Sequence, residues 1–217
     1  MSMNFALARH TMIEQQIRPW DVLDPRVLAV LAAVRREDFV PEAQRTLAFA
    51  DLPLPLAHGE YMMKPVHEGR LLQALAIAPS DCVLEIGTGS GYLTACLAKL
   101  SHETVSIDIH NDFLTAARRC FDIAEIGNVR LECADALTWH CDRQFDVIAV
   151  TGAVAEIPTA FLQWLAPGGR LFVVRGHSPV QEAVVMTRSG DDFKTTSLFE
   201  TDILYLRGTA PTAHFTL

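Results

Sequence analysis

Apolar residues recur along this chain with two different spacings. Over the first 60 residues they stand three or four positions apart, which predicts short helices joined by turns. Pro19 ends the first helix, and an Asp-Pro pair caps and opens a second helix over 24–34. A further short helix is expected from Pro41. The segment 51–56 is predicted to be extended, because residues before proline avoid the helical region.

From residue 58 onward the pattern changes. A loop over 58–65 precedes a helix over 66–76, and from Asp81 short apolar runs alternate with helical patterns. Such alternation predicts right-handed crossovers and a doubly wound, mostly parallel α/β sheet. The expected strands cover 82–86, 104–109, 129–133, 145–150 and 171–174, and the expected helices cover 92–100, 112–124 and 158–165.

The C-terminal part lacks a helical pattern. Residues 182–187 and 198–206 are predicted as strands on either side of a polar turn over 189–192, which indicates an antiparallel hairpin added to the sheet. No internal repeat or low-complexity linker divides the chain, so we expect one domain over 1–217. Its expected parts are N-terminal helices with a loop over 1–65, an α/β core over 66–175 and a hairpin extension over 176–217.

Composition and charge limit the classes of function. The chain has 217 residues and a mass of 24.0 kDa, and half of its residues are hydrophobic, which is enough for one sizeable core. The net charge of −8 disfavours nucleic acid as a partner, because an acidic surface repels phosphates. No stretch approaches the roughly 18 apolar residues of a membrane span. Arg9 and Glu14 argue against a signal peptide, so we expect a cytoplasmic protein without a membrane partner.

The cysteines and histidines predict neither disulfides nor a metal site. Cysteine occurs five times, without a Cys-x-x-Cys pair, and Cys82 and Cys96 lie in segments with the pattern of buried elements. The eight histidines are scattered and form no His-x-x-x-His pair. We therefore expect reduced, structural thiols and no metal.

The strongest chemical signal is the glycine-rich turn after the strand 82–86. It places glycine at 87, 89 and 91, where the first strand of an open α/β sheet turns into a helix and binds its ligand. A dinucleotide fold would place its last glycine at position 92, which here is Tyr92. Gly-x-Gly-x-Gly after the acidic strand residue Glu85 is typical of S-adenosylmethionine (SAM) methyltransferases, so SAM is the predicted cofactor.

Polar residues at the ends of the following strands support this interpretation. Asp108 ends the second strand about 20 residues after Gly87, where an acid accepts hydrogen bonds from ribose hydroxyls. Asp135 follows the third strand, where it either meets the adenine amino group or caps its own loop. Glu85 is placed to hold the cofactor's amine, directly or through water, and Thr151 either faces the cleft or caps a turn. The predicted cofactor-binding residues are Glu85, Gly87, Thr88, Gly89, Ser90, Gly91, Asp108, Ile109, Asp135, Ala136 and Thr151.

Beyond the cofactor motif, the chain resembles the protein-L-isoaspartate O-methyltransferase family. This resemblance implies a Rossmann-like methyltransferase fold, SAM as methyl donor, and damaged proteins or peptides bearing isoaspartate as substrates in protein repair. It also implies that the segment before the helix 66–76 closes over cofactor and substrate. The matching stretches are Met12 to Arg18, Arg36 to Pro41, Val83 to Gly91, Ala155 to Pro158 and Pro167 to Leu171.

The substrate loop departs from the family pattern Gly-x-Thr-Ile-Ser-x-Pro. Residues 59–65 keep its ends, but Tyr61 stands at the threonine position and Met63 at the serine position. A thioether cannot donate a hydrogen bond to a substrate carboxylate. Met62 and Met63 are expected to form a wall of the cofactor site or to accept an apolar substrate. The alternative is that they pack onto the core.

Three functions remain open at this stage. The first is the isoaspartyl carboxyl methyltransferase, which needs no general base because a carboxylate is already ionised, so we assign no catalytic residue. The second is a SAM-dependent methyltransferase for another protein or small-molecule acceptor, with His58, His67 and Glu68 as the nearest candidate bases. The third is a non-enzymatic SAM-binding protein. A nucleic-acid methyltransferase is disfavoured, because residues 151–154 lack an Asn/Asp-Pro-Pro-Tyr/Phe segment.

Overall fold

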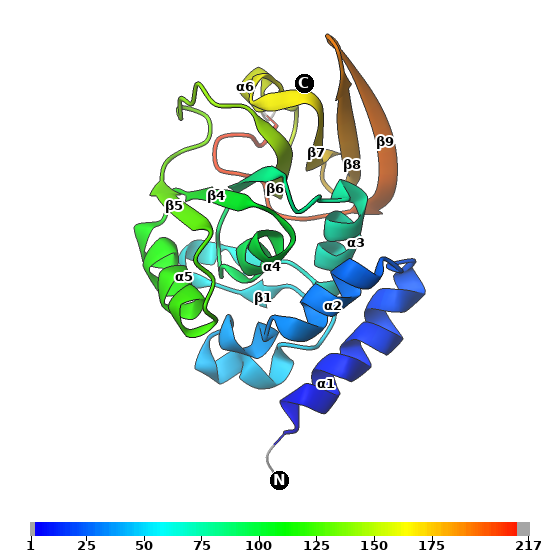
Figure 1. Cartoon of the computed structure of the whole chain (residues 1–217), viewed down its shortest axis with the longest axis vertical. Coiled ribbons are helices and arrows are strands. Elements are labelled where there is room, and N and C mark those ends of the chain that lie inside the picture. Colours follow the sequence, from blue (N-terminus) through cyan, green and yellow to red (C-terminus); the bar gives the residue numbers. More distant parts are fainter. Residues whose placement is uncertain (1–2, 212–217) are drawn as a thin grey trace, which may run out of the picture.

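A seven-stranded sheet forms the centre of this computed structural model, which describes residues 3–211 (Figure 1). The strands are β3 (Cys82–Ile86), β4 (Glu103–Asp108), β5 (Val129–Cys133), β6 (Phe145–Val154), β7 (Leu165–His177), β8 (Val180–Ser189) and β9 (Asp192–Thr201). Their order in space is β5-β4-β3-β6-β7-β8-β9, with the first five parallel and the last two antiparallel. The predicted fold class is therefore confirmed.

Helices cover both faces of the sheet, and apolar side chains alternate between the two sides of each strand. The helices are α1 (Phe5–Met12), α2 (Pro25–Ala33), α3 (Pro65–Leu75), α4 (Tyr92–Leu100), α5 (Asn111–Ile123) and α6 (Thr159–Gln163). Val83 and Val147 belong to the core that faces α3 and α4, whereas Leu84 and Ile148 belong to a second core around Phe161 of α6. This alternation is the period of two that β-strands impose on their side chains.

The N-terminal segment packs as a helical cap on α3 and α4. After α1 the chain continues through a π-helical turn over Ile13–Ile17 and a 3-10 turn over Arg18–Trp20, which contains Pro19. Asp24 accepts a hydrogen bond from the Arg26 N–H and caps α2 as predicted. Two further 3-10 turns follow, over Arg36–Asp38 and Glu42–Leu47. In Figure 1 these blue elements lie below α4, at the opposite end of the molecule from the tip of the C-terminal hairpin.

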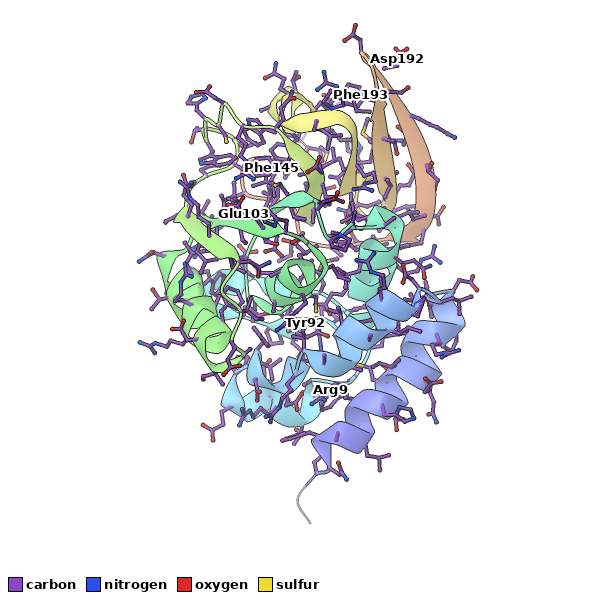
Figure 2. All side chains as sticks on the ribbon, viewed as in Figure 1. Arg9, Tyr92, Glu103, Phe145, Asp192 and Phe193 are labelled. Atoms are coloured by element: carbon purple, nitrogen blue, oxygen red, sulfur yellow. The ribbon has the colours of Figure 1, made fainter. Side chains whose placement is uncertain are left out.

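The predicted last strand, 198–206, is wrong in its position. β9 begins at Asp192, directly after the turn at Gly190, and ends at Thr201. It is an edge strand with a largely exposed face, so its first half carries polar residues and lacks the apolar pattern expected of a strand. Its tip at Asp192 and Phe193 projects from the body (Figure 2). The apolar residues after β9 leave the sheet edge instead and pair with Ala153 at the end of β6, through Leu204 and Leu206.

Other boundaries differ less. The predicted helix 158–165 is shortened to α6, and β7 already begins at Leu165 and contains the Pro-Gly-Gly segment as an irregular stretch of strand. Residues 212–217 of the predicted C-terminal extension lie outside the described residues. No helix within 3–211 is both long and apolar enough to cross a membrane.

One fully buried cation joins the N-terminal segment to the rest. The Arg36 guanidinium donates to the carbonyl oxygens of Ala48 (2.8 Å) and Met63 (2.7 Å) and forms an ion pair with Glu68. It also lies over the ring of Tyr92, 4.8 Å from the centroid. Figure 2 places Tyr92 in the interior between α4 and the N-terminal helices. A buried charge is tolerated only when its donors are satisfied, so these contacts fix the segments that supply them.

We expect Arg36→Met to lower the free energy of unfolding by about 3–5 kcal/mol, because it leaves Glu68 buried without its partner. Adding Glu68→Gln should recover at least about 1 kcal/mol, since it removes the unpaired carboxyl. Urea unfolding measures both. Arg18→Met is the matched control: its ion pair with Glu14 is half exposed and contributes about 0.5 kcal/mol or less. Equal losses for the two arginine variants would contradict this role of Arg36.

Candidate active site

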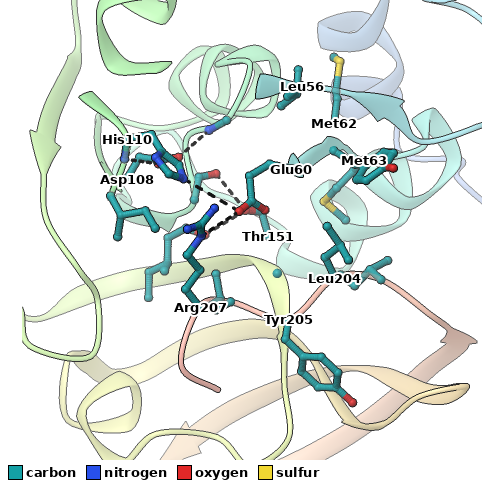
Figure 3. A pocket seen from close by; sticks show the side chains of 18 of the residues that line it. Leu56, Glu60, Met62, Met63, Asp108, His110, Thr151, Leu204, Tyr205 and Arg207 are labelled. Atoms are coloured by element: carbon teal, nitrogen blue, oxygen red, sulfur yellow. Dashed lines mark hydrogen bonds and ion pairs between the residues drawn. The ribbon is translucent and has the colours of Figure 1, made fainter. Parts of the chain in front are cut away.

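A pocket of about 520 Å³ opens at the carboxyl ends of the central strands. β3 pairs with β4 on one side and with β6 on the other, so the chain crosses over in opposite directions from this point. Ligands of open α/β sheets bind at such a point. The wall is completed by the loop over 60–64 and by the C-terminal segment over 202–207, as the close view in Figure 3 shows.

The glycine-rich turn forms the floor of this pocket. Gly87 has φ of 98°, and a Cβ there would lie 2.2 Å from the hydroxyl oxygen of Thr151. That hydroxyl in turn donates to the carbonyl oxygens of Ile86 (3.0 Å) and Gly87 (2.9 Å). Thr151 therefore holds the turn from below, and only glycine fits at position 87. Gly91, with φ of 82°, has the same need, because a Cβ there would lie 2.7 Å from that of Ala117 in α5.

Two carboxylates line the pocket beside this turn. Asp108 ends β4 and accepts hydrogen bonds from the backbone N–H groups of Gly89 and His110, each at 2.9 Å. Each carboxylate oxygen retains a free lone pair, so Asp108 can still accept from a ligand hydroxyl. Asp135 follows β5, accepts from the Leu137 N–H at 2.9 Å and is exposed to the pocket. Its loop-capping role and its position in the pocket wall thus coexist.

Glu85 lies behind the pocket wall and is fully buried. Its carboxyl accepts hydrogen bonds from the hydroxyls of Thr94 and Ser106 (2.6 Å), and one of its oxygens has no partner among the described residues. Burial raises the pKa of the Glu85 carboxyl to about 8, against the opposing effect of the two hydroxyl donors. Because the Glu85 carboxyl does not line the pocket, it is not in a position to contact a cofactor amine directly.

The predicted cofactor residues therefore separate into two sets. Those that line the pocket are Gly87, Gly89, Asp108, Ile109, Asp135, Ala136 and Thr151. Those that support it from behind are Glu85, Thr88, Ser90 and Gly91. Thr88 forms a buried 2.6 Å hydrogen bond with Ser106, and Ser90 accepts from the Tyr92 N–H at the start of α4. Binding of a cofactor by either set stays a prediction.

The predicted substrate loop folds back over the pocket as a short hairpin. β1 (Leu54–Pro55) pairs with β2 (Tyr61–Met62), with a turn over Ala57–Gly59 between them. Tyr61, Met62 and Met63 all line the pocket. Tyr61 is half exposed at the rim, whereas Met62 is buried and also belongs to the core. Both interpretations of the methionines, pocket wall and core packing, thus apply together.

Side chains from two distant segments fasten this loop. Arg207 pairs with Glu60 at 3.3 Å and donates to the His58 carbonyl oxygen at 3.1 Å, and His110 lies 4.0 Å from the Glu60 carboxylate (Figure 3). On the other side, His58 pairs with Asp112 at 2.9 Å. Each contact is at least partly exposed, so each is individually weak. The loop is therefore closed by several weak attachments rather than by one strong one.

Among residues 3–211, one cluster of side chains has the spacing of a metal site. It consists of His58, His110 and Asp112, whose potential ligand atoms lie within 4.8 Å of one another. The two imidazoles are stacked, with centroids 3.9 Å apart and planes 4° from parallel. The lone pairs of imidazole nitrogens lie in the ring plane, so parallel rings cannot direct them at one ion. In this arrangement His58 stacks on His110 and pairs with Asp112, and both contacts hold the loop.

Several residues of the site were missed by sequence reasoning. Glu60, Lys64, His110 and Arg207 all line the pocket. His67, which the sequence offered only as a candidate base, lines it as well. The signal for Lys64 was its place in the altered loop, next to Met63. No local signal marks Arg207, because residues 198–206 have the pattern of a strand and direct attention to the sheet edge.

Comparisons with known proteins identify relatives over most of the chain. The model of the protein-L-isoaspartate(D-aspartate) O-methyltransferase family matches residues 8–209. Protein-L-isoaspartate O-methyltransferase 2 of Shewanella sediminis is 34% identical over 195 residues, which are 89% of this chain and 80% of that protein. The Desulfotalea psychrophila protein-L-isoaspartate O-methyltransferase is 36% identical over 191 residues, 88% of this chain and 89% of that protein.

Solved structures agree in fold. A Plasmodium falciparum structure named as a β-aspartate methyltransferase, in complex with S-adenosyl-L-homocysteine, superimposes with a TM-score of 0.80 at 18% identity and covers 95% of this chain and 99% of that one. A second protein-L-isoaspartate O-methyltransferase gives a TM-score of 0.79 at 22% identity, covering 93% of this chain and 66% of that one. At these identities the likeness concerns the fold.

We expect Gly87→Ala to weaken binding of S-adenosyl-L-homocysteine at least about tenfold, because the added Cβ collides with the Thr151 hydroxyl and displaces the turn. Isothermal titration calorimetry measures the affinity. Gly190→Ala is the matched control: it has the same kind of positive φ, at 64°, but no atom within 4 Å of the added Cβ, and it lies in the hairpin turn. Unchanged affinity in Gly87→Ala would contradict the role of this turn.

Glu85 has a consequence for stability as pH changes. Its pKa is raised in the folded state, so the folded protein holds a proton that the unfolded chain has lost between about pH 5.5 and 7.5. Its contribution to stability is complete below the unfolded pKa and declines by about 1.4 kcal/mol per pH unit through this window. Glu85→Gln should remove this part of the slope, as measured by urea unfolding at each pH. Glu42→Gln, at an exposed position, should leave the slope unchanged, and an unaltered slope in Glu85→Gln would contradict the assignment.

Proposed function

The chain belongs to the protein-L-isoaspartate(D-aspartate) O-methyltransferase family, and we propose that it transfers a methyl group from SAM to the free α-carboxylate of isoaspartyl residues in proteins. The observation that carries this proposal is the family match over residues 8–209, which includes both the glycine-rich turn and the loop that closes the pocket. The methyl donor of the family is SAM, and the enzyme is an O-methyltransferase.

The residues present fit this cofactor. The pocket of about 520 Å³ has room for SAM together with an acceptor group. The missing Cβ of Gly87 leaves room for the Thr151 hydroxyl that supports the turn, and both residues line the pocket where the ligand would lie. Asp108 would hold the ribose through its free lone pairs, and Asp135 with Ala136 would border the adenine. Glu85 would act behind this wall, through a water molecule.

Catalysis would require little acid–base chemistry from the protein. SAM supplies a methyl group activated by its positive sulfur, and the acceptor carboxylate is ionised at neutral pH. The chain's contribution is to align the acceptor and to exclude water. Met62, Met63 and Leu204 provide apolar walls, while the contacts of Glu60 with Arg207 hold the loop closed. An acceptor oxygen in this environment loses hydration and becomes more nucleophilic.

The rim of the pocket suits a polypeptide. Tyr61 and Leu204 are each about half exposed beside the opening and would contact residues that flank the acceptor. Deeper along the same wall, the Tyr205 hydroxyl accepts from the Ser178 N–H and donates to the Gly176 carbonyl oxygen, each at 2.9 Å. These bonds fix the C-terminal segment in the position where it forms one side of the acceptor end.

A second function rests on one specific observation. Met63 lines the pocket where the family places a serine, and its thioether offers no donor to a carboxylate. A methyltransferase for a different protein or small-molecule acceptor would be consistent with this change. The assay below separates the two functions.

We propose the cytoplasm as the site of action. All five cysteines are free, and Cys96 is fully buried among apolar residues. Proteins without disulfides are typical of reducing compartments.

The test of the proposed function uses SAM with a labelled methyl group. An isoaspartyl peptide and its normal aspartyl twin are incubated with the protein, and base-labile methyl ester is counted on each. We expect label on the isoaspartyl peptide alone, because only that peptide presents the free α-carboxylate at the required place.

The control is binding of S-adenosyl-L-homocysteine by the same preparation. Cofactor binding without label on either peptide would overturn the isoaspartyl assignment and leave a methyltransferase for another acceptor. Equal label on both peptides would show that the enzyme does not select isoaspartate.

A further inference from the structure

Two polar side chains line the pocket at the start of α3. Lys64 is the residue immediately before the helix, with an extended backbone (φ −63°, ψ 143°), and His67 follows in the first turn. Residues three apart at a helix start lie on the same side. Both side chains line the pocket next to Met63.

Lys64 provides a positive charge that is not used within the described structure. No carboxylate among residues 3–211 lies within 4.0 Å of its ammonium group. Arg207, the other cation of the pocket wall, is already paired with Glu60. The acceptor end of the pocket therefore has one lysine available for an anion.

His67 is buried but has no polar partner in the described structure. Only 8% of the residue is exposed, and its ring stacks on Phe199 with centroids 5.1 Å apart. No other residue within 3–211 forms a hydrogen bond with the ring. Burial, followed by the charge of Lys64, lowers the pKa of His67 to about 4, although Asp51 opposes this shift. The imidazole is therefore neutral at pH 7 and carries one N–H donor.

A ring N–H without a protein partner, on a residue that lines a pocket, is available to a ligand. The ammonium group of Lys64 adds a positive charge, which favours an anionic ligand over a neutral one. Together they match a carboxylate: the ammonium supplies a charge-assisted hydrogen bond and the imidazole a neutral one. A carboxamide would satisfy this pair less well, since it carries no charge.

Building on the proposed function, we propose that Lys64 and His67 bind the acceptor carboxylate, in place of the hydroxyl donor that the loop lacks at Met63. They are specificity residues for the acceptor and take no part in the cofactor end of the pocket. Methyl transfer removes the charge from the carboxylate, so a lysine that binds the ionised acceptor stabilises the ground state more than the transition state. Its loss should therefore raise KM without lowering kcat.

The experiment compares wild type with Lys64→Met, Lys64→Arg and His67→Phe. His67→Phe keeps an aromatic ring on Phe199 and removes only the nitrogens. For each protein saturated with S-adenosyl-L-homocysteine, calorimetry gives the affinity for an isoaspartyl peptide and for its α-carboxamide twin. The same proteins are then assayed for KM and kcat with labelled SAM. Lys99→Met is the matched control, because Lys99 is exposed in the last turn of α4, remote from the pocket.

We expect wild type to prefer the carboxylate peptide at least about tenfold, and Lys64→Met to lose most of this preference with a similar rise in KM. His67→Phe should lose about threefold or more, and Lys64→Arg should retain most of the preference. The affinity for S-adenosyl-L-homocysteine should be unchanged in all of them, which also verifies that the pocket is folded.

The outcomes distinguish this inference from the proposed function. If wild type methylates the isoaspartyl peptide and the Lys64 and His67 variants keep its preference, the inference is wrong and the proposed function stands. If no peptide is methylated but the carboxylate preference is present and depends on Lys64, the proposed function is wrong and the carboxylate site stands. A wild-type protein that binds S-adenosyl-L-homocysteine without any carboxylate preference overturns the inference.

Discussion

The buried guanidinium of Arg36 is the contact on which the arrangement around the pocket depends. It takes its acceptors from the N-terminal segment, from the substrate loop at Met63 and from α3 at Glu68, and it lies over the ring of Tyr92. Burial raises the pKa of the Glu68 carboxyl and the Arg36 charge opposes that rise. Since a buried cation requires its partners, Arg36 holds the N-terminal segment against the base of the loop and the first turn of α3.

Two groups of residues build the wall of the pocket. One part of its wall is built from the glycine-rich turn and from the carboxylates of Asp108 and Asp135, all positioned by the sheet. Another part is built from the loop over 60–64, the start of α3 and the segment 202–207. Although the chain has a net charge of −8, Lys64 and Arg207 place positive charge in this second part of the wall. Net charge therefore says little about the local potential that a substrate meets.

The tip and the base of the substrate loop are held by contacts that differ in solvent exposure. The carbonyl oxygen of Met63 is held by the buried side chain of Arg36, whereas Glu60 and His58 are held by the exposed or partly exposed side chains of Arg207 and Asp112. Exposed ion pairs contribute little individually and are screened by salt. The tip of the loop can thus open at low cost while its base stays in place. Such a division suits an enzyme that must admit a polypeptide and then exclude water from the reacting atoms.

The sequence by itself determined the α/β core, because its signals are local. Apolar runs bounded by turn residues predict β3 through β6, and glycines at 87, 89 and 91 mark the ligand-binding turn whatever surrounds them. The family pattern likewise identified the substrate loop and its altered residue Met63. These features depend on neighbours within a few positions along the chain.

Tertiary structure alone decided which side chains complete the site. The polar edge strand β9 has no apolar signature, so the following segment was taken for a strand, although it crosses to β6 and carries Arg207 to the pocket. Glu85 does not line the pocket, because its carboxyl is hydrogen-bonded to the buried hydroxyls of Thr94 and Ser106. The spacing of Lys64 and His67 puts them on one side of the start of α3, but only packing places that side against the pocket. Contacts between residues far apart in sequence depend on packing, which no local pattern records.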